Sequence, residues 1–339
     1  MKKLPQPIPY QGSKRNIADL ILDYFPQGVA RMVELFAGSA ALSIAVSYRG
    51  LAQKFWLNDL NQPLAELIRY IIENPLEIAD KYQTLWEAQL GQERQFYDDV
   101  RDEFNRTHCP EQFLYLLARC VKASVRYNSN GEFNQSPDNR RKGRHPTGMR
   151  REIQAFSALL KGRTKVTSLD FRDTIALIEP TEDFVYLDPP YQGTSGTRDA
   201  RYCSGVDLSE LVAFLDKLNQ RNIMFALSYD GVKGDKSYGA ELPNALGLYK
   251  ILLDAGRSTQ STLLGQDHIT YESLYLSPAL VSNLDLKRQP NIRNSIQDVQ
   301  TIRRVKPVDL QLTMDFSSSF APSYFSTDHI LAFTTTYLR

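Results

Sequence analysis

Short apolar segments alternate with helically spaced segments in the first sixty residues and again in the second half of the chain. Apolar runs bounded by turn residues predict strands at 31–36, 54–57, 165–169, 184–187, 222–228, 248–253 and 272–276. Apolar residues at helical spacing predict helices at 17–25, 40–48, 62–82 and 208–218. Because strands and helices that alternate in this way cover both faces of a sheet, the pattern predicts an α/β fold with a doubly wound, mostly parallel sheet.

A long segment between the second and third predicted strands interrupts this alternation. It is helical at first and becomes polar and basic from 127 to 148. Because one loop of about 100 residues does not fit inside a compact domain, the segment predicts an inserted helical and loop subdomain. We therefore expect a sheet domain at 1–62 and 164–278, an inserted subdomain at 63–163, and a C-terminal extension at 279–339 whose role the pattern does not define.

The composition is that of an ordinary globular protein, with 339 residues, 42% hydrophobic and 23% charged. No apolar run reaches about 18 residues, and three prolines interrupt the first nine residues, so we expect a cytoplasmic protein with no membrane contact. The three cysteines form no C-x-x-C pair and the chain has only four histidines. We therefore expect neither a disulfide framework nor a metal site.

The basic residues are concentrated in one segment. Residues 119–165 contain twelve Lys or Arg and three acidic residues, a net charge of +9, so the remainder of the chain carries −8 against a total of +1. Blocks of like charge are most often solvated surface. This segment is also rich in Asn, Tyr, Phe and Gly, which suits a surface that contacts phosphates and base edges.

The most informative motif is Asp188-Pro189-Pro190-Tyr191, directly after the predicted strand 184–187. Ligands of open α/β sheets bind at the carboxyl ends of the strands, where this motif places an acid and an aromatic ring. The prolines keep the chain extended, so the Asp188 carboxylate and the Pro189 carbonyl can face one cavity. Two acceptors beside a ring suit the exocyclic amine of a planar base. An acidic turn that only closes the strand is the alternative.

A second candidate turn follows the first predicted strand. Small residues between Phe36 and Ala40 let a ligand approach the free N–H groups at the start of the next helix. The turn lacks G-x-G-x-x-G, which favours a nucleoside over a dinucleotide. Asp59 lies 21 residues beyond Gly38, at the end of the next strand, where an acid can accept both ribose hydroxyls. Capping of the following helix is the alternative for Asp59.

Two further groups carry chemistry of the same kind. Asp170 and Phe171 place an acid and an aromatic ring at the end of the predicted strand 165–169, with helix capping as the alternative. Near the amino terminus, a glycine-bearing turn carries Tyr10 and Lys14, and its cation can meet a carboxylate. Taken alone, this second pattern is more typical of solvated surface.

Five motifs, in this order, resemble those of the Dam-type, alpha-group DNA N6-adenine methyltransferases. They are Tyr10-Gln-Gly-Ser-Lys14, Glu34-Leu-Phe-Ala-Gly-Ser39, Asn58-Asp-Leu-Asn61, Arg126-Tyr-Asn-Ser-Asn-Gly-Glu-Phe-Asn134 and Asp188-Pro-Pro-Tyr191. The resemblance spans about residues 7–278, and five motifs in sequence are far more specific than any one. It implies a Rossmann-like, site-specific enzyme that transfers the methyl group of S-adenosylmethionine to N6 of a flipped adenine in double-stranded DNA.

The resemblance also implies roles for individual residues. The residues implied to bind S-adenosylmethionine are Tyr10, Lys14, Glu34, Phe36, Gly38, Asp59, Asp170, Phe171 and Asp188, and the catalytic residues are Asp188, Pro189, Pro190 and Tyr191. The insertion corresponds to the target-recognition domain, with DNA contacts at Arg126, Tyr127, Asn128, Asn130, Phe133, Asn134, Arg140, Arg141, Lys142 and Arg144. Family members often have tryptophan in place of Tyr10, and a different continuation after Asn134, so the recognition sequence need not be the common one.

From the resemblance we expect a prokaryotic or phage-encoded monomer that acts on chromosomal DNA without a metal ion. The sequence leaves open the target sequence and whether a cognate restriction endonuclease accompanies the protein. Three rival functions also stay open. They are an N4-cytosine methyltransferase, whose motif usually begins with serine in place of Asp188, a nicotinamide-dependent oxidoreductase, which the single-glycine turn disfavours, and an inactive DNA-binding protein with the same fold.

Overall fold

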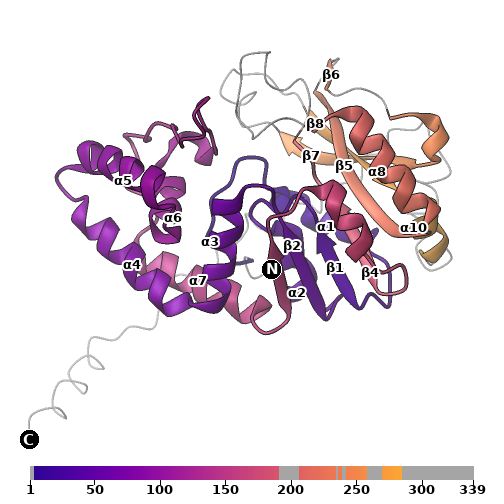
Figure 1. The fold of residues 1–339 in the computed structure, drawn as a ribbon, viewed down its shortest axis with the longest axis horizontal. Helices are drawn as coiled ribbons and strands as arrows, with labels where there is room; N and C mark the ends of the chain where they lie inside the picture. Colours follow the sequence, from indigo (N-terminus) through magenta and orange to yellow (C-terminus); the bar gives the residue numbers. More distant parts are fainter. Residues whose placement is uncertain (1–3, 191–205, 234–235, 239–241, 258–268, 285–339) are drawn as a thin grey trace, which may run out of the picture. The chain divides into compact units, whose positions relative to one another are not determined.

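A central sheet organises the protein in the computed structural model (Figure 1). The structure describes residues 4–190, 206–233, 236–238, 242–257 and 269–284. Among these residues the strands follow the order β3-β2-β1-β4-β5-β8-β7, and β6 pairs with β5. The strands are β1 Arg31–Glu34, β2 Lys54–Asn58, β3 Thr164–Thr167, β4 Asp183–Leu187, β5 Met224–Lys233, β6 Lys236–Tyr238, β7 Tyr249–Arg257 and β8 Ile269–Leu276.

The sheet is parallel through its first five strands and antiparallel at its far edge. β3, β2, β1, β4 and β5 pair in parallel, whereas β8 runs antiparallel to both β5 and β7. This arrangement confirms the predicted α/β fold with a mostly parallel sheet. The chain places β2 and β3 on one side of β1 and β4 on the other, which makes the ends of β1 and β4 a topological switch point where ligands of such sheets bind.

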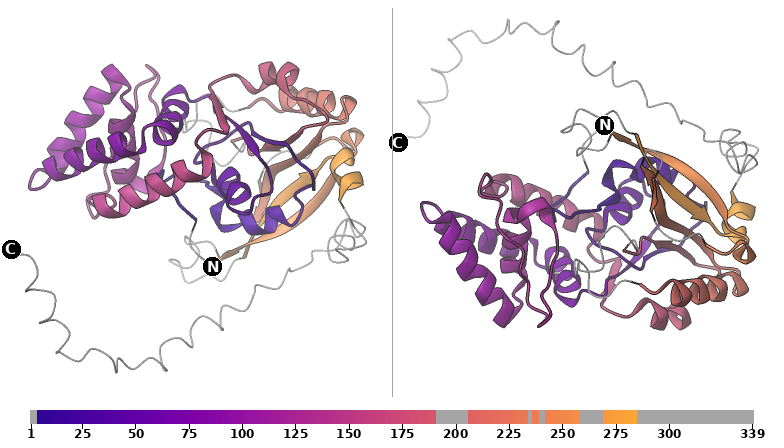
Figure 2. Two further views of the ribbon diagram at one scale, coloured as in Figure 1. Left: turned by 90° about the horizontal axis from the view of Figure 1, so that it is seen from below. Right: turned by 90° about the horizontal axis from the view of Figure 1, so that it is seen from above.

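Helices cover both faces of this sheet (Figures 1 and 2). The α-helices are α1 Ala18–Leu22, α2 Ala41–Tyr48, α3 Gln62–Glu73, α4 Pro75–Ala88, α5 Glu93–Thr107, α6 Pro110–Arg119, α7 Pro146–Leu160, α8 Leu208–Gln220 and α10 Pro278–Asn283, and the short 3-10 helices are η1 Lys14–Asn16, η2 Val121–Ala123, η3 Phe171–Leu177 and η4 Asn244–Leu246. None of the described helices is long and apolar enough to span a membrane.

Consecutive strand residues build two separate cores because their side chains point to opposite faces of the sheet. Met32 and Phe55 join one cluster with α1, α2, α3 and α7, whereas Val33 and Trp56 join the other cluster with α8 and η3. The strands of the middle of the sheet are therefore apolar on both faces, as expected for buried parallel strands.

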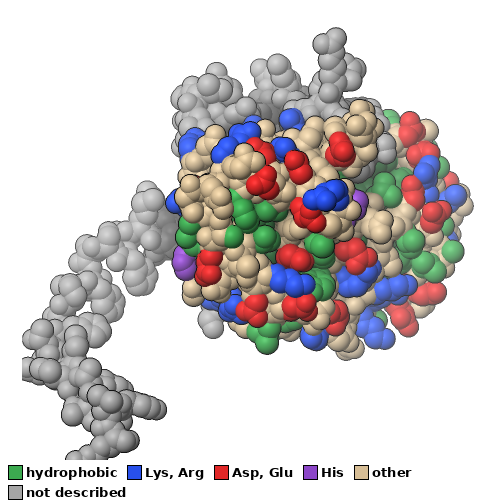
Figure 3. Space-filling model, turned by 60° about the vertical axis from the view of Figure 1, so that its left-hand side comes forward, with side chains coloured by type: hydrophobic (Ala, Val, Ile, Leu, Met, Phe, Trp, Pro, Cys, Tyr) green, Lys and Arg blue, Asp and Glu red, His purple; other side chains and the backbone are tan. Residues whose placement is uncertain are grey.

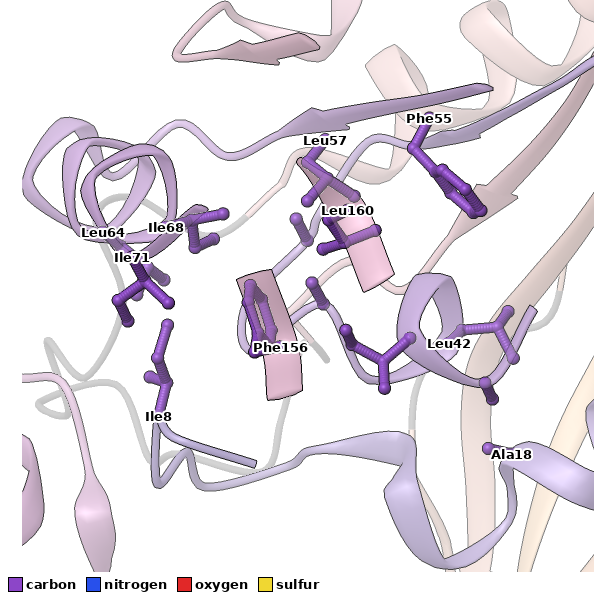
Figure 4. Close-up of a cluster of buried hydrophobic side chains, with 14 of the residues drawn as sticks. Ile8, Ala18, Leu42, Phe55, Leu57, Leu64, Ile68, Ile71, Phe156 and Leu160 are labelled. Atoms are coloured by element: carbon purple, nitrogen blue, oxygen red, sulfur yellow. The ribbon is translucent and has the colours of Figure 1, made fainter. Parts of the chain in front are cut away.

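The insertion packs on the sheet through α3 and α7. Figure 4 shows Phe156 and Leu160 of α7 in one cluster with Leu64 and Ile68 of α3 and Leu57 of β2. Each of these side chains is fully buried, and burial of one such side chain contributes about 1.5–3 kcal/mol. The seam fixes the first and last helices of the insertion to the sheet, while α4, α5 and α6 extend away from it (Figure 1).

Two element boundaries differ from the sequence prediction. The single helix expected at 62–82 is two helices, because Pro75 cannot donate a backbone hydrogen bond and forces Asn74 out of helical geometry. The basic segment expected to be loop-like to 148 ends earlier, since α7 begins at Pro146 with the side chain of His145 as its cap. Of the expected extension at 279–339, the structure describes only the part up to 284, in which Leu280 of α10 is buried against β5.

Candidate active site

A cavity of about 230 Å³ lies at the carboxyl ends of β1, β2 and β4. All nine residues predicted to bind the cofactor line it, namely Tyr10, Lys14, Glu34, Phe36, Gly38, Asp59, Asp170, Phe171 and Asp188. Pro189 and Pro190 of the predicted catalytic motif also line it, whereas Tyr191 lies outside the described residues. Residues that are far apart in the sequence therefore meet at the switch point of the sheet.

Asn58, at the end of β2, holds three neighbouring strand ends together beside the cavity. Its amide group donates to the carbonyls of Leu35 (3.2 Å) and Leu169 (2.9 Å). Its side-chain oxygen accepts from the Thr167 hydroxyl (2.7 Å) and the Leu169 N–H (2.9 Å). Asn58 is fully buried, so every hydrogen-bonding position of the carboxamide is used without water.

The turn between β1 and α2 depends on backbone conformations that favour glycine. Gly38 has φ +51°, and a Cβ atom there would lie 3.0 Å from a ring carbon of Tyr10. Asp59 accepts from the Gly38 N–H (2.8 Å) and from the Asn61 N–H (3.0 Å). The cap of α3 is Asn61, whose side chain accepts from Leu64, so Asp59 braces the turn and does not cap the helix.

The N-terminal turn closes over this first turn and also contacts the insertion. The hydroxyls of Ser13 and Ser39 lie 2.9 Å apart and form a hydrogen bond. The Gln11 N–H donates to the Ala123 carbonyl at 3.0 Å, just after α6. Tyr10 and Lys14 therefore enter the cavity on a segment that is held on two sides.

Glu34 ends β1 as a buried acid at the start of α2. Its carboxyl group accepts from the Ser43 N–H (3.2 Å) and the Ser43 hydroxyl (2.5 Å), in the first turn of the helix. Burial raises the pKa of Glu34 to about 8, against the lowering effect of these hydrogen bonds, and the nearby Asp188 carboxylate raises it further. At neutral pH the pKa of Glu34 thus favours the protonated form, which avoids a second negative charge beside Asp188.

Asp188 forms an ion pair with a buried lysine, and this lysine has a second acidic partner. Lys14 Nζ lies 3.1 Å from Asp188 Oδ1 and 2.9 Å from Glu272 Oε2. Burial raises the pKa of Asp188 to about 6; Lys14 opposes this shift and Glu272 adds to it. No motif in the sequence includes Glu272, whose local signal is that it is the one acid in the strand Ile269–Leu276.

Asp170 and Phe171 lie on the rim of the cavity at the start of η3. Asp170 accepts from the backbone N–H (2.9 Å) and the guanidinium of Arg172, which holds the pKa of this carboxyl below its usual range. Phe171 packs against Phe36, with ring centroids 5.5 Å apart, and the two rings form an apolar wall. Asp170 thus caps η3 and also lines the cavity, so capping does not exclude its predicted contact with the cofactor.

Of the predicted DNA-contacting residues, only Tyr127 lines the cavity. Its hydroxyl lies 3.2 Å from the side-chain oxygen of Asn61 in a hydrogen bond. Around it, residues 126–134 form a tight hairpin in which Asn134 N–H donates to the Arg126 carbonyl (3.0 Å). The Asn128 side chain accepts from the N–H groups of Asn130 and Glu132, both at 2.9 Å, and so shapes the tip of the hairpin.

Phe133, a predicted DNA contact, is buried in the insertion. Its side chain is only 1% exposed and packs edge to face on Phe104 and Phe113. Asn105 of α5 bonds both the N–H and the carbonyl of Phe133, at 2.8 and 3.0 Å. This expectation is corrected. The apolar ring anchors the polar hairpin, because transfer of the ring from water to the apolar core is favourable.

The basic loop that follows is held by buried polar side chains of α4, of its C-cap Gln89 and of α5. Gln89 donates to the Lys142 carbonyl (2.9 Å), and the Tyr82 hydroxyl donates to the Arg144 carbonyl (2.7 Å). Similarly, the Tyr97 hydroxyl donates to the Gln135 carbonyl (2.8 Å). The loop is held in place without regular secondary structure, because side chains of the helical region supply the hydrogen-bond donors that its backbone carbonyls need.

The positive charges of this segment differ in their availability. The side chains of Arg140 and Arg141 are 86% and 68% exposed, although both lie near Asp138. Lys142 pairs with Glu93 (2.8 Å) and Arg144 pairs with Glu152 (2.9 Å). In Figure 3, Lys and Arg side chains are interspersed with Asp and Glu on the side of the molecule that faces the viewer. The net charge of the segment therefore overstates the charge that a ligand would meet.

Sheet order and cavity position together define the class, a Rossmann-like α/β protein with its ligand site at the topological switch point. The chain belongs to the D12 class N6 adenine-specific DNA methyltransferase family, whose model matches residues 10–252. This confirms the resemblance found in the sequence. Membership implies S-adenosylmethionine as the methyl donor and DNA as the substrate class. The described residues contain no group of three or more His, Cys, Asp or Glu side chains that could hold a metal ion.

Relatives of known name come from bacteria, archaea, a phage and a virus. Modification methylase StsI of Streptococcus sanguinis is 28% identical over 238 residues, which are 67% of this chain and 35% of that protein. Retron Ec67 DNA adenine methylase of Escherichia coli is 29% identical over 191 residues, which are 55% of this chain and 63% of that protein. Type II methyltransferase M.MjaIII of Methanocaldococcus jannaschii is 26% identical over 243 residues, which are 65% of this chain and 82% of that protein. The chain spans about a third of the length of the first curated relatives it matches.

Replacement of Gly38 by alanine is expected to destabilise the fold more than the same change at Gly50. Both glycines have positive φ, +51° and +67°, but only at Gly38 would the new methyl group meet a ring, that of Tyr10. We expect Gly38→Ala to lower the free energy of unfolding in urea by about 1 kcal/mol more than Gly50→Ala. Adding Tyr10→Ala to Gly38→Ala should remove this excess; equal losses for both glycines would contradict the close contact.

Replacement of Glu34 by glutamine should change how stability depends on pH. The folded protein retains the Glu34 proton up to about pH 8, whereas the unfolded chain loses it near 4.5, the ordinary pKa of a glutamate side chain. Between these values the wild type therefore loses stability as pH rises, by about 1.4 kcal/mol per pH unit at most. Urea unfolding between pH 5.5 and 8 should show a smaller decline for Glu34→Gln, and parallel pH profiles would show that Glu34 is ionised in the fold.

Proposed function

We propose that this chain is a site-specific DNA adenine methyltransferase, which transfers the methyl group of S-adenosylmethionine to N6 of a flipped adenine in double-stranded DNA. One observation carries the proposal. A single cavity is lined by the Asp188 motif, by the turn that Asp59 braces at Gly38, and by Tyr127 from the insertion. The Asp188 motif suits an amine, and the turn at Gly38 suits a nucleoside. Tyr127 connects the cavity to the segment with the exposed arginines.

The residues present fit S-adenosylmethionine. Gly38 leaves the space that a Cβ atom would fill, next to the Tyr10 ring. Each Asp59 oxygen accepts one backbone hydrogen bond and retains a lone pair for a ribose hydroxyl. Phe36 and Phe171 offer an apolar wall for a planar ring. An adenine contact at Asp170 is less well supported, because both oxygens of this carboxylate already bond Arg172.

The chemistry of methyl transfer explains the acid at position 188. When bound, S-adenosylmethionine supplies a methyl group carried on a sulfonium ion. The N6 lone pair of adenine is delocalised into the ring, so the amine must first bend toward tetrahedral geometry. Hydrogen bonds from N6 to the Asp188 carboxylate and the Pro189 carbonyl favour this bend and stabilise the positive charge that develops on nitrogen. We assign Tyr191 to stacking on the flipped base, in line with its place in the motif.

We assign the insertion at 63–163 to target recognition and the sheet region at 1–62 and 164–278 to catalysis. Arg140 and Arg141 are the best placed of the predicted basic residues to contact phosphates, since their side chains are more exposed than those of Lys142 and Arg144. Candidates for base contacts are Asn128, Asn130 and Asn134, at the polar hairpin beside Tyr127. A hairpin and loop that are held in advance lose less conformational entropy when they bind DNA.

A monomer suffices for this proposal, because one chain supplies every group of the cavity. Among the relatives, StsI is named a modification methylase and M.MjaIII a type II methyltransferase, which supports a paired restriction endonuclease as a partner. The Ec67 relative is named a DNA adenine methylase. Adenine is also favoured over cytosine as the target base because the motif begins with Asp188 and not with serine. Genome-wide mapping of modified bases in a host without adenine methylation would identify the base and its sequence.

Asp188→Asn is expected to reduce methyl transfer by about 10²-fold or more, since the carboxylate charge that stabilises the developing cation is lost while the shape is kept. Transfer of radiolabelled methyl groups to unmethylated DNA measures the rate, and a filter-binding assay should show DNA affinity within about threefold of the wild type. Asp173→Asn removes an exposed acid outside the cavity and serves as the control. Turnover retained by Asp188→Asn would overturn the assignment.

The double variant Arg140→Ala/Arg141→Ala is expected to bind DNA more weakly than the wild type. Its DNA affinity should also depend less on salt concentration. If each arginine neutralises one phosphate, the slope of log Kd against log salt concentration should fall by about 2. The rate of methyl transfer at saturating DNA should change little, because neither side chain lines the cavity. Arg94→Ala, which removes another exposed arginine of the insertion, is the matched control. An unchanged slope would show that the DNA lies elsewhere.

A further inference from the structure

Glu272 is an acid of the candidate site that no motif includes. Lys14 Nζ lies between two carboxylates, 3.1 Å from Asp188 Oδ1 and 2.9 Å from Glu272 Oε2. The Lys14 side chain is only 7% exposed, and the two acids are 19% and 23% exposed. A buried ammonium of this kind requires compensation by nearby charge, and here two acids share that role.

The fold brings Glu272 to this place through the antiparallel edge of the sheet. Glu272 lies on β8, opposite Gly231 of β5, where the pairing register shifts between Ser228 and Gly231. Such an irregularity alters the local twist and direction of a strand and commonly redirects side chains near sites. The acid therefore reaches Lys14 from a strand that supplies no residue to the cavity lining among those the structure describes.

The charges of the three groups decide what Glu272 can do. Lys14 and Asp188 alone would be neutral as a pair, and a neutral pair stabilises a positive charge on the substrate amine only weakly. With Glu272 the three groups carry one net negative charge. Methyl transfer makes a nitrogen–carbon bond and breaks the carbon–sulfur bond, so that sulfur leaves as a neutral thioether and the positive charge passes to N6. The methylated amine then releases one proton to solvent. A net negative group beside N6 favours that transfer of charge.

We propose that Glu272 is a positioning residue for methyl transfer. It holds the Lys14 ammonium, and Lys14 in turn orients Asp188. Because Glu272 also offsets the charge of Lys14, Asp188 keeps its negative charge toward the substrate amine. This inference rests on the proposed function. Glu272 acts through Lys14 and does not itself line the cavity. It explains why the ammonium has an acid on each side and not a single ion-pair partner.

The acidic limb of the pH profile offers a direct readout. Asp188 is faced by Lys14 from η1, by Glu272 from β8 and by Glu34 from β1. Loss of the Glu272 charge should lower the pKa of Asp188 below about 6, and loss of the Lys14 charge should raise it. A purely structural role for Glu272 would change the amount of active protein but would not move this limb.

The experiment compares wild type, Glu272→Gln, Lys14→Met and the matched control Asp254→Asn, in which an acid on the adjacent strand β7 is replaced. Initial rates of methyl transfer are measured from pH 5 to 9 at saturating S-adenosylmethionine, over DNA concentrations that extend to saturation. We expect the acidic limb of Glu272→Gln to shift down by about one pH unit, its plateau kcat to fall about tenfold, and its KM for DNA to stay within about twofold. Asp254→Asn should match the wild type.

A second readout does not depend on activity. The carbon-13 carboxyl resonance of Asp188, assigned by its absence in Asp188→Asn, should titrate at the lowest pH in Glu272→Gln and at the highest in Lys14→Met. A Glu272→Gln protein with unmoved limb and titration midpoint would overturn the inference, whether or not its kcat falls. A wild type that transfers no methyl group would instead refute the proposed function, and the order of the midpoints would still decide the role of Glu272.

Discussion

The candidate site depends above all on the buried carboxamide of Asn58. Its four hydrogen bonds reach a carbonyl after β1, a hydroxyl at the end of β3, and both backbone groups of Leu169, so the loop ends around the cavity cannot separate without leaving buried polar groups unpaired. The next residue, Asp59, then extends the same edge to the Gly38 turn. The cradle proposed for the cofactor is therefore continuous with the hydrogen bonding of the sheet, which keeps its geometry fixed before any ligand arrives.

Burial controls the electrostatics of this edge. Glu34 and Asp188 end adjacent parallel strands, where two ionised carboxylates would repel one another in a poorly solvated region. The structure relieves this repulsion in two ways. Burial raises the pKa of Glu34 to about 8, which favours its neutral form, while the Lys14 ammonium compensates Asp188. One carboxylate, that of Asp188, is thus left for the acceptor role proposed for it, and its neighbour Glu34 bonds the first turn of α2.

The insertion follows a different principle, in which polar side chains on helices replace regular pairing. Tyr82, Gln89 and Tyr97 each bond the backbone of the segment between the hairpin and α7. Asn105 bonds the backbone of Phe133 within the hairpin, and the Phe133 ring anchors the hairpin in the helical core. Exposed Arg140 and Arg141 are consequently displayed on a loop with fixed ends. For a protein that reads DNA, such a loop can vary in its exposed residues without loss of its supports.

The sequence by itself determined the sheet class, the order of most strands and helices, and the residues of the Asp188, Gly38 and Asp59 motifs, because periodicity, prolines and positive-φ glycines act locally. The resemblance to a known family then singled out the nine candidate cofactor residues, which line one cavity. Only the tertiary structure decided that Phe133 is buried, that much of the basic segment is already paired, and that Glu272 reaches Lys14. These facts depend on contacts between strands and helices far apart in the chain, whose geometry no local pattern of residues specifies.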